Sequence, residues 1–159
     1  MMRLTTKSNM SELKGIKKEL KNKRLRIVID TGVWISFLIG KALKSLNHYL
    51  NLKKQSITIL FSDELFEEII DVLHRPKIKK YLTDEQVADI IGLIHHKAHW
   101  VKIVEKTDIC RDKKDNFLLD LAGNGKADYL ITGDQDLLIL KDFQGTKIVN
   151  FKDFNNLFS

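Results

Sequence analysis

Four carboxylates from separate parts of the sequence carry its strongest chemical signal: Asp30, Glu68, Asp115 and Asp134. If folding gathers them in one cleft, they repel one another and raise one another's pKa values unless a cation neutralises their charge. Hard oxygen ligands of this kind select Mg²⁺ or Mn²⁺. Metal ions roughly 3.5–4 Å apart can generate a hydroxide nucleophile and stabilise the attacking and leaving oxygens of a phosphodiester. The chemistry that these residue types best support is therefore metal-dependent phosphodiester hydrolysis.

Two of these acids stand at the carboxyl ends of predicted strands. Residues 25–29 form a compact β-branched run that breaks at Asp30-Thr31-Gly32, which predicts a buried strand followed by a turn. Residues 129–132 form another such strand, which ends at Gly133-Asp134. Because ligands of a parallel sheet bind beyond the carboxyl ends of its strands, we expect Asp30 and Asp134 at one edge.

The other two acids stand near the beginnings of predicted helices. Ser62 is a good N-cap for a helix that should stop before Pro76, and Glu68 lies two turns or less into it. Glu64 and Glu67 are the rivals of Glu68 for the site. They also have a structural explanation, because the helix dipole favours acids in the first turn of a helix.

The second of these helices runs from Asp115 to about Ala122. The segment Gly123-Asn124-Gly125 serves as its C-cap. The structural alternative for Asp115 is the cap of this helix, and Asp112 is its nearest rival for the site.

The remaining apolar patterns alternate between strand and helix. They predict helices over residues 33–39 with a continuation through 43–52, from Thr83 onward, over 136–140 and over a terminal turn at 151–157, and strands over 56–61, 101–104 and 147–149. Strands that are apolar on both faces and separated by helices indicate a mostly parallel sheet covered on both sides. The predicted fold class is therefore α/β, a three-layer α/β/α domain.

The net charge of +6 is concentrated at the beginning of the chain. Through Arg26 there are nine Lys and Arg against two Glu, a charge of +7, which leaves −1 for the remainder. We therefore expect a basic extension over residues 1–24, partly disordered with a short helix from about Met10 to Leu20, and a nearly neutral domain over residues 25–159. Such an extension can attract RNA or another partner, or simply improve solubility.

Composition favours one ordinary globular domain in a reducing compartment. The 159 residues are 43% hydrophobic and 30% charged. The single cysteine, Cys110, cannot form an intrachain disulfide, and no apolar signal segment begins the sequence, so a cytoplasmic location is expected. Apolar runs are shorter than the roughly 20 residues that span a bilayer, so we expect no membrane role.

Four motifs in order resemble those of the PIN-domain family. They are Ile27-Val28-Ile29-Asp30-Thr31-Gly32, the helix from Ser62 to Leu73, Asp115-Asn116-Phe117-Leu118-Leu119-Asp120-Leu121-Ala122, and the segment from Ala127 to Leu138. Their spacing is similar to that of bacterial PIN proteins described as toxin components of toxin-antitoxin systems. The resemblance covers roughly Ile27 to the C-terminus.

The resemblance implies a Mg²⁺- or Mn²⁺-dependent ribonuclease. Asp30, Glu68 and Asp115 match the three central acids of the family, Asp134 matches the fourth, and Asp136 assists. An antitoxin whose tail covers the cleft and a homodimer are the partners that the resemblance suggests. One departure is that the usual Asp-Thr-Asn motif has Gly32 in place of the Asn, so an amide that positions the nearby acids is lost.

Several polar residues have both a functional and a structural interpretation. Thr31 and Thr132 are candidates for bonding the carboxylates or a phosphate, although strand-end threonines often satisfy only local backbone. A basic stretch is a candidate RNA contact or a solvated loop: Arg75, Lys77, Lys79 and Lys80. The histidines at 95, 96 and 99 lack a matching ligand pair at metal spacing, which favours a solvated helix end.

The leading hypothesis is an endoribonuclease that leaves 5′-phosphate and 3′-hydroxyl ends. The sequence contains no Gly-rich phosphate loop followed by Lys-Ser or Lys-Thr and no G-x-S-x-G elbow. A catalytically silent PIN-like module that binds RNA or protein is the main alternative, motivated by Gly32. A phosphoacceptor or phosphatase built on Asp30 is weaker, because no Asp lies two residues beyond it.

Overall fold

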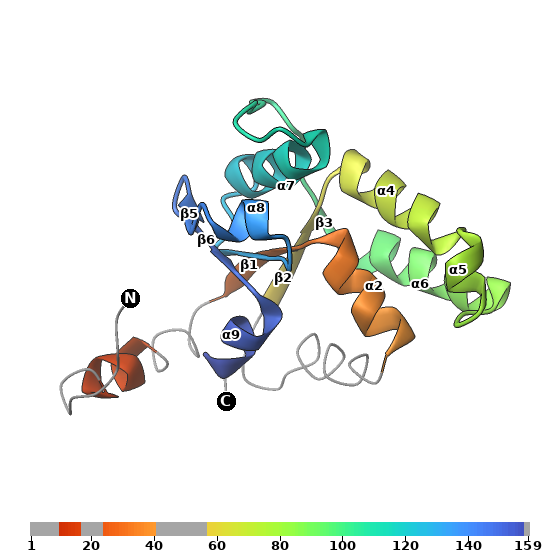
Figure 1. The fold of residues 1–159 in the computed structure, drawn as a ribbon, viewed down its shortest axis with the longest axis horizontal. Coiled ribbons are helices and arrows are strands. Elements are labelled where there is room, and N and C mark those ends of the chain that lie inside the picture. Colours follow the sequence, from red (N-terminus) through yellow and green to blue (C-terminus); the bar gives the residue numbers. More distant parts are fainter. Residues whose placement is uncertain (1–9, 17–23, 41–56, 158–159) are drawn as a thin grey trace.

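The computed structural model describes residues 10–16, 24–40 and 57–157. Within these ranges six strands form one sheet with the order β3-β2-β1-β4-β6-β5 (Figure 1). The strands are β1 (Leu25–Ile29), β2 (Ile57–Phe61), β3 (His99–Trp100), β4 (Tyr129–Ile131), β5 (Asp142–Phe143) and β6 (Thr146–Val149). Every neighbouring pair is parallel except β5 and β6. The prediction of an α/β fold with a mostly parallel sheet is confirmed.

Helices flank this sheet, with α7 on one side and α9 on the other (Figure 1). The helices are α2 (Thr31–Ile39), α4 (Asp63–Leu73), α5 (Pro76–Lys79), α6 (Asp84–Lys97), α7 (Lys113–Asn124), α8 (Gln135–Leu138) and α9 (Phe151–Asn156). Residues 10–16 are also helical. The predicted continuations over 17–20 and 43–52 lie outside the described residues, as do residues 1–9 and Ser56.

The central strands are buried because their apolar side chains point to both covered faces. Val28, Leu60 and Leu130, from β1, β2 and β4, are all 0% exposed. Strand β1 pairs with β4 in the register Ile27↔Tyr129 through Ile29↔Ile131, so the two strands end at the same level. Asp30 and the residues that follow β4 therefore leave the sheet together, as the sequence predicts.

The prediction of a strand over residues 101–104 is wrong, because β3 pairs with β2 two residues earlier. The register is Leu60↔His99 and Phe61↔Trp100, and the last bond of this ladder runs from Val101 N to Phe61 O at 2.8 Å. Beyond it β2 has ended, and the N–H groups of Val104 and Glu105 donate to the Asn124 side chain instead.

Two predictions about helix ends also need correction. The segment Thr31-Gly32 is the first turn of α2 and not a separate turn, with Asp30 as the N-cap. At the end of α7 the C-cap is Gly125, as predicted, but its φ is −85°, and the left-handed residue is Lys126 with a φ of 50°. A Cβ at Gly125 would lie 2.8 Å from both Leu121 O and a Leu60 methyl, so close packing explains this glycine.

Two short elements escape sequence analysis. Helix α5 has one turn and begins at Pro76, where the missing N–H costs nothing. Strand β5 has two residues and reaches β6 through Gln144 and Gly145, whose φ values are 48° and 88°. Elements this short contain too few residues to show an apolar period.

Candidate metal centre

Asp30 stands where β1 passes into α2, at the centre of the sheet edge. Its N–H donates to Ile131 O of β4 at 2.9 Å. Its carboxylate accepts a hydrogen bond from the Thr132 hydroxyl at 2.6 Å, and Thr132 is fully buried. The Asp30 side chain makes no capping bond to α2.

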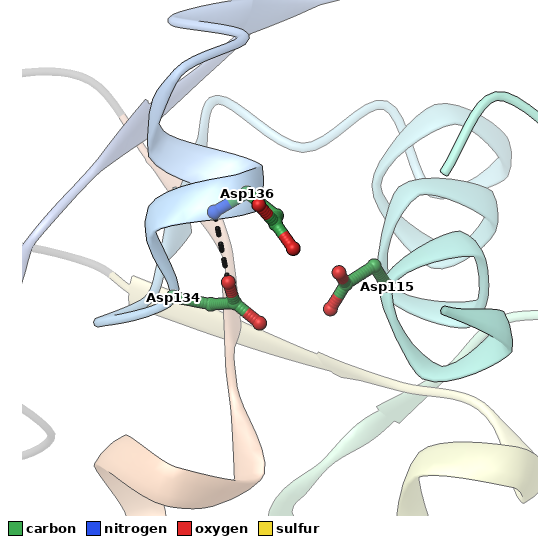
Figure 2. A group of neighbouring side chains, drawn as sticks. All are labelled: Asp115, Asp134 and Asp136. Carbon is green, nitrogen blue, oxygen red and sulfur yellow. Dashed lines mark hydrogen bonds between the residues drawn. The ribbon is translucent and has the colours of Figure 1, made fainter. Parts of the chain in front are cut away.

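Asp134 and Asp136 belong to the turn that connects β4 to α8. The Asp134 N–H donates to the Thr132 hydroxyl at 3.0 Å, so Thr132 binds two of the predicted site residues. The Asp134 carboxylate accepts from the Asp136 N–H at 2.9 Å (Figure 2). Asp134 is therefore the N-cap of α8.

Asp115 enters the site from α7, but it is not the helix cap. Asp112 is the N-cap and accepts from the Lys114 N–H at 3.0 Å, so α7 begins at Lys113 and not at Asp115. Asp115 lies in the first turn and is only 4% exposed. Since Asp112 caps the helix, Asp115 is released from that role and points toward the turn between β4 and α8 (Figure 2).

These three acids meet although they come from distant parts of the chain. One carboxylate oxygen from each of Asp115, Asp134 and Asp136 lies within 4.8 Å of the others. Burial raises the pKa of Asp115 to about 6, and the charges of Asp134 and Asp112 add to the effect. The fold thus holds negative charge close together where it is costly without a cation.

Glu68 and Asp30 extend this group toward α4. Burial raises the pKa of Glu68, Lys114 opposes the rise, and Asp30 adds to it. Asp30 also raises the pKa of Asp115, so it is within electrostatic reach of both sides. We refer to these five residues as the acidic cluster: Asp30, Glu68, Asp115, Asp134 and Asp136.

The structure separates Glu68 from its two rivals on α4. Glu67 is exposed, and the charge of Glu64 raises the pKa of Asp120 instead of a member of the acidic cluster. Lys114 Nζ lies 3.9 Å from Glu68 Oε1, which ties Glu68 to the helix that carries Asp115. Of the three candidate glutamates of α4, Glu68 is therefore the one that belongs to the acidic cluster.

A comparison with known protein families identifies the family of this chain. A family model described as PIN domain matches residues 26–136, which include the whole acidic cluster. The chain belongs to the PIN-domain family. PIN domains are generally nucleases, and PIN nucleases typically use divalent metals. Neither the search of curated proteins nor the search of solved structures produced a match.

The donor set of this PIN domain fits a hard divalent cation. Its acidic cluster supplies only carboxylate oxygens, which are the ligands that Mg²⁺ and Mn²⁺ prefer. The Thr31 hydroxyl is a second sign of a ligand. It is 4% exposed and near enough to lower the pKa of Glu68, yet it makes no well-formed hydrogen bond within the described residues. A buried polar atom without a hydrogen-bond partner in the protein usually indicates a water, ion or ligand that supplies one.

Other predicted site residues of the PIN domain lie apart from the acidic cluster. Arg75 is paired with Asp71 at 2.9 Å, and Lys77, Lys79 and Lys80 are exposed. They belong to the turn after α4 and to α5, at the end of α4 that points away from α7 (Figure 1). Any contact they make with RNA would involve nucleotides distant from the acidic cluster.

The histidines also lie outside the acidic cluster. Within the described part of the chain, the one group of three or more potential metal ligands contains only aspartates. His95 packs its ring against Phe66 and Trp100, at centroid distances of 6.0 and 5.7 Å.

No helix among the described residues is long and apolar enough to cross a membrane.

Two residues near the acidic cluster were missed by the sequence analysis. Burial raises the pKa of the Cys110 thiol, and Asp115, Asp136 and Asp134 raise it further, so this cysteine borders the acids. Lys114 was not singled out either. One feature of the sequence could have identified Lys114: it is a lysine in the first turn of a helix, where the helix dipole disfavours a cation.

Proposed function

We propose that this PIN domain is a Mg²⁺- or Mn²⁺-dependent endoribonuclease that hydrolyses RNA phosphodiester bonds. The observation that carries the proposal is the approach of Asp115, Asp134 and Asp136 to within 4.8 Å of one another, beside Asp30 and Glu68. A fold gains no stability from crowding carboxylates in this way, since each ionised neighbour makes the others harder to ionise. The arrangement becomes favourable when a cation binds.

The residues of the acidic cluster divide into two sets around the expected cations. Asp30 and Asp115 would be the direct ligands, and Glu68 would bind or orient the cation and its water. Asp134 and Asp136 would complete a second, weaker position. Divalent cations held there would activate water and neutralise charge on the attacking and leaving oxygens.

The two threonines have supporting roles in this proposal. Thr132 donates to Asp30 at 2.6 Å and accepts from the Asp134 N–H, so it fixes how these two aspartates are presented. The Thr31 hydroxyl is buried and lowers the pKa of Glu68, so its role would be to hold that carboxylate in place. The expected products carry 5′-phosphate and 3′-hydroxyl ends.

Incubation of the purified protein with labelled RNA, with Mn²⁺ and with a chelator, tests this function. We expect cleavage only with Mn²⁺, and none from Asp30→Asn although that variant folds. Glu68→Gln should lose most of the activity, whereas Glu67→Gln is the matched control, because its side chain is exposed on the same helix. An Asp30→Asn protein that cuts RNA at the wild-type rate refutes the assignment. RNA binding without any cleavage favours the catalytically silent alternative.

We also propose the domain limits and the biological setting. Residues 25–159 are taken as the nuclease domain and residues 1–24 as a basic extension. The protein would act as a toxin, with an antitoxin segment over the acidic cluster and with self-association as a dimer. Growth arrest on expression of the wild type, absent with Asp30→Asn, tests the toxin role, and sedimentation analysis tests the dimer.

A further inference from the structure

Among the described residues, Lys114 is the cation that forms an ion pair with the acidic cluster. Its ammonium lies 3.9 Å from Glu68 Oε1, and its charge lowers the pKa of Glu68. Lys114 lies in the first turn of α7, directly before Asp115, and reaches across to α4. Within the described ranges, the cation paired with Glu68 therefore comes from the helix that also supplies Asp115.

Stability does not explain why a lysine occupies this position. A cation in the first turn of a helix is disfavoured by the helix dipole. The contact with Glu68 is at the long limit for an ion pair and forms no hydrogen bond, and the Lys114 side chain is 57% exposed. Such partly exposed pairs contribute little to folding and are easily exchanged.

We propose that Lys114 changes its partner during catalysis. It pairs with Glu68 in the metal-free protein and binds a phosphate of the RNA once a divalent cation has taken Glu68. This inference rests on the proposed nuclease function. A cation bound at Glu68 repels the nearby ammonium and removes its carboxylate partner. The Lys114 side chain, which is 57% exposed, is then free to bind a phosphate of a substrate that reaches the acidic cluster.

The exchange also addresses an electrostatic difficulty of the site. The acidic cluster and Asp112 together present six carboxylates to an anionic substrate. Bound cations neutralise part of this charge, and a lysine on the rim provides attraction outside their reach. Lys114 is in this sense a substrate-binding residue, so its removal should weaken RNA binding and leave the chemical step nearly unchanged.

Two measurements on Lys114→Met test the two halves of the exchange. Calorimetric titration of the metal-free protein with Mn²⁺ should show binding tighter by about two- to fivefold, because a competing cation is gone. Cleavage kinetics should show KM for RNA raised by about five- to tenfold, the effect of one partly exposed charged contact, with kcat changed by less than about twofold. The dependence of log KM on log salt concentration should become shallower by about 0.7, the value for one lost contact with single-stranded phosphate.

Two further variants separate this role from a general effect of charge. Lys114→Arg keeps the charge and should keep KM within about twofold of the wild type. Lys113→Met removes the neighbouring lysine, which is exposed and has no ion pair with any described residue, and it should leave Mn²⁺ binding unchanged. Opposite shifts of metal and RNA affinity in Lys114→Met alone support the exchange.

Several outcomes would overturn the inference. An unchanged KM in Lys114→Met, with wild-type cleavage intact, removes Lys114 from RNA binding while the nuclease assignment stands. Weaker Mn²⁺ binding in that variant means that the ion pair only positions Glu68. If the wild type does not cleave RNA at all, the proposed function fails by itself, and an unchanged Mn²⁺ affinity in Lys114→Met then rejects the exchange as well.

Discussion

Helix α7 carries two buried aspartates whose surroundings are opposite. Asp115 is 4% exposed and Asp120 is 6% exposed, and burial raises the pKa of both. Around Asp120 the fold opposes this rise, since the Thr107 N–H donates to its carboxylate at 2.6 Å and Lys106 is nearby. Around Asp115 the further neighbours are acids, which add to the rise.

The residues beside Asp120 show how thoroughly the fold pairs its polar groups there. Asn116, Asp120 and Asn124 stand four positions apart on one face of α7 and hold the segment that crosses it. Asn116 bonds both the N–H and the carbonyl of Cys110, at 2.9 and 3.0 Å. Asn124 accepts from Val104 and Glu105 and donates back to the Glu105 carbonyl at 2.7 Å.

This contrast distinguishes a structural acid from an acid kept for a ligand. Buried polar groups are normally paired, and Asp120 follows that rule. Asp115 lies little more than one turn away on the same helix, and the charges that act on it most strongly are those of other acids. A buried acid whose pKa is raised by burial and by neighbouring acids is a candidate functional group. The following predictions test whether the two aspartates differ as the comparison requires.

The largest expected effect is on activity. Asp115→Asn should lower the rate of Mn²⁺-dependent RNA cleavage by about a thousandfold or more, because a lost cation ligand removes several kcal/mol of charge stabilisation. Asp120→Asn, which keeps an oxygen for the Thr107 N–H, should retain activity within about tenfold. Similar losses of activity in both variants would contradict the distinction between a functional Asp115 and a structural Asp120.

The next effect is on stability without metal, and the two sites should respond in opposite directions. Because the pKa of Asp115 is raised from 3.8 to about 6 in the fold, ionising it costs stability, and this cost grows between pH 3.8 and pH 6 and is constant above pH 6. Asp115→Asn should therefore raise the free energy of unfolding at neutral pH by about 1–3 kcal/mol. The gain should be full above pH 6 and should shrink as the pH falls from 6 toward 3.8, where the carboxyl becomes protonated in both the folded and the unfolded state.

Asp120→Ala is the variant whose free energy of unfolding should change in the opposite direction. It leaves the Thr107 N–H without its acceptor and should lower the free energy of unfolding by about 1–2 kcal/mol. Urea denaturation of both variants in the presence of a chelator measures the two changes. A destabilised Asp115→Asn protein would mean that its carboxylate is stabilised in the fold by a partner other than a cation.

Proton competition at Asp115 predicts a pH dependence of similar or smaller size. A cation requires the ionised carboxylate, and the pKa of about 6 lies within the accessible range. Mn²⁺ affinity should fall about tenfold between neutral pH and one unit below that pKa. Calorimetric titrations with wild type and Asp120→Asn should show the same fall, because Asp120 lies outside the acidic cluster. A flat profile would contradict the assignment of Asp115 as a ligand.

The smallest expected effect comes from adding an amide side chain next to the acidic cluster. Asn116 and Asn124 of α7 provide such amides on either side of Asp120. Gly32→Asn introduces one beside Asp30 and restores the usual Asp-Thr-Asn motif. A Cβ at Gly32 would meet no atom within 4 Å, so the backbone has room for a side chain to begin there. We expect unfolding free energy to rise by roughly a few tenths of a kcal/mol from helix propensity, and cleavage to change by less than about fivefold. A gain of a hundredfold would show that the missing amide limits the natural protein.

Sequence patterns predicted what depends on local order. The β-branched runs before Asp30 and Asp134 identified two strands and their ends, and Ser62 and Thr83 identified helix starts that the structure contains. The motifs also identified the PIN-domain family, which the family comparison confirms. These inferences hold because apolar periodicity and capping depend on residues a few positions apart.

Tertiary structure alone decided which polar groups face one another. Glu64, Glu67 and Glu68 are equivalent as acids of one helix, and only the packing of α4 beside α7 brings Glu68 to Lys114 and leaves Glu64 near Asp120. The sequence likewise held Asp112 and Asp115 as rivals, and the capping bond to Lys114 N assigned them separate roles. Side-chain direction across a helix pair depends on the rotation and approach of both helices, which no single stretch of sequence specifies.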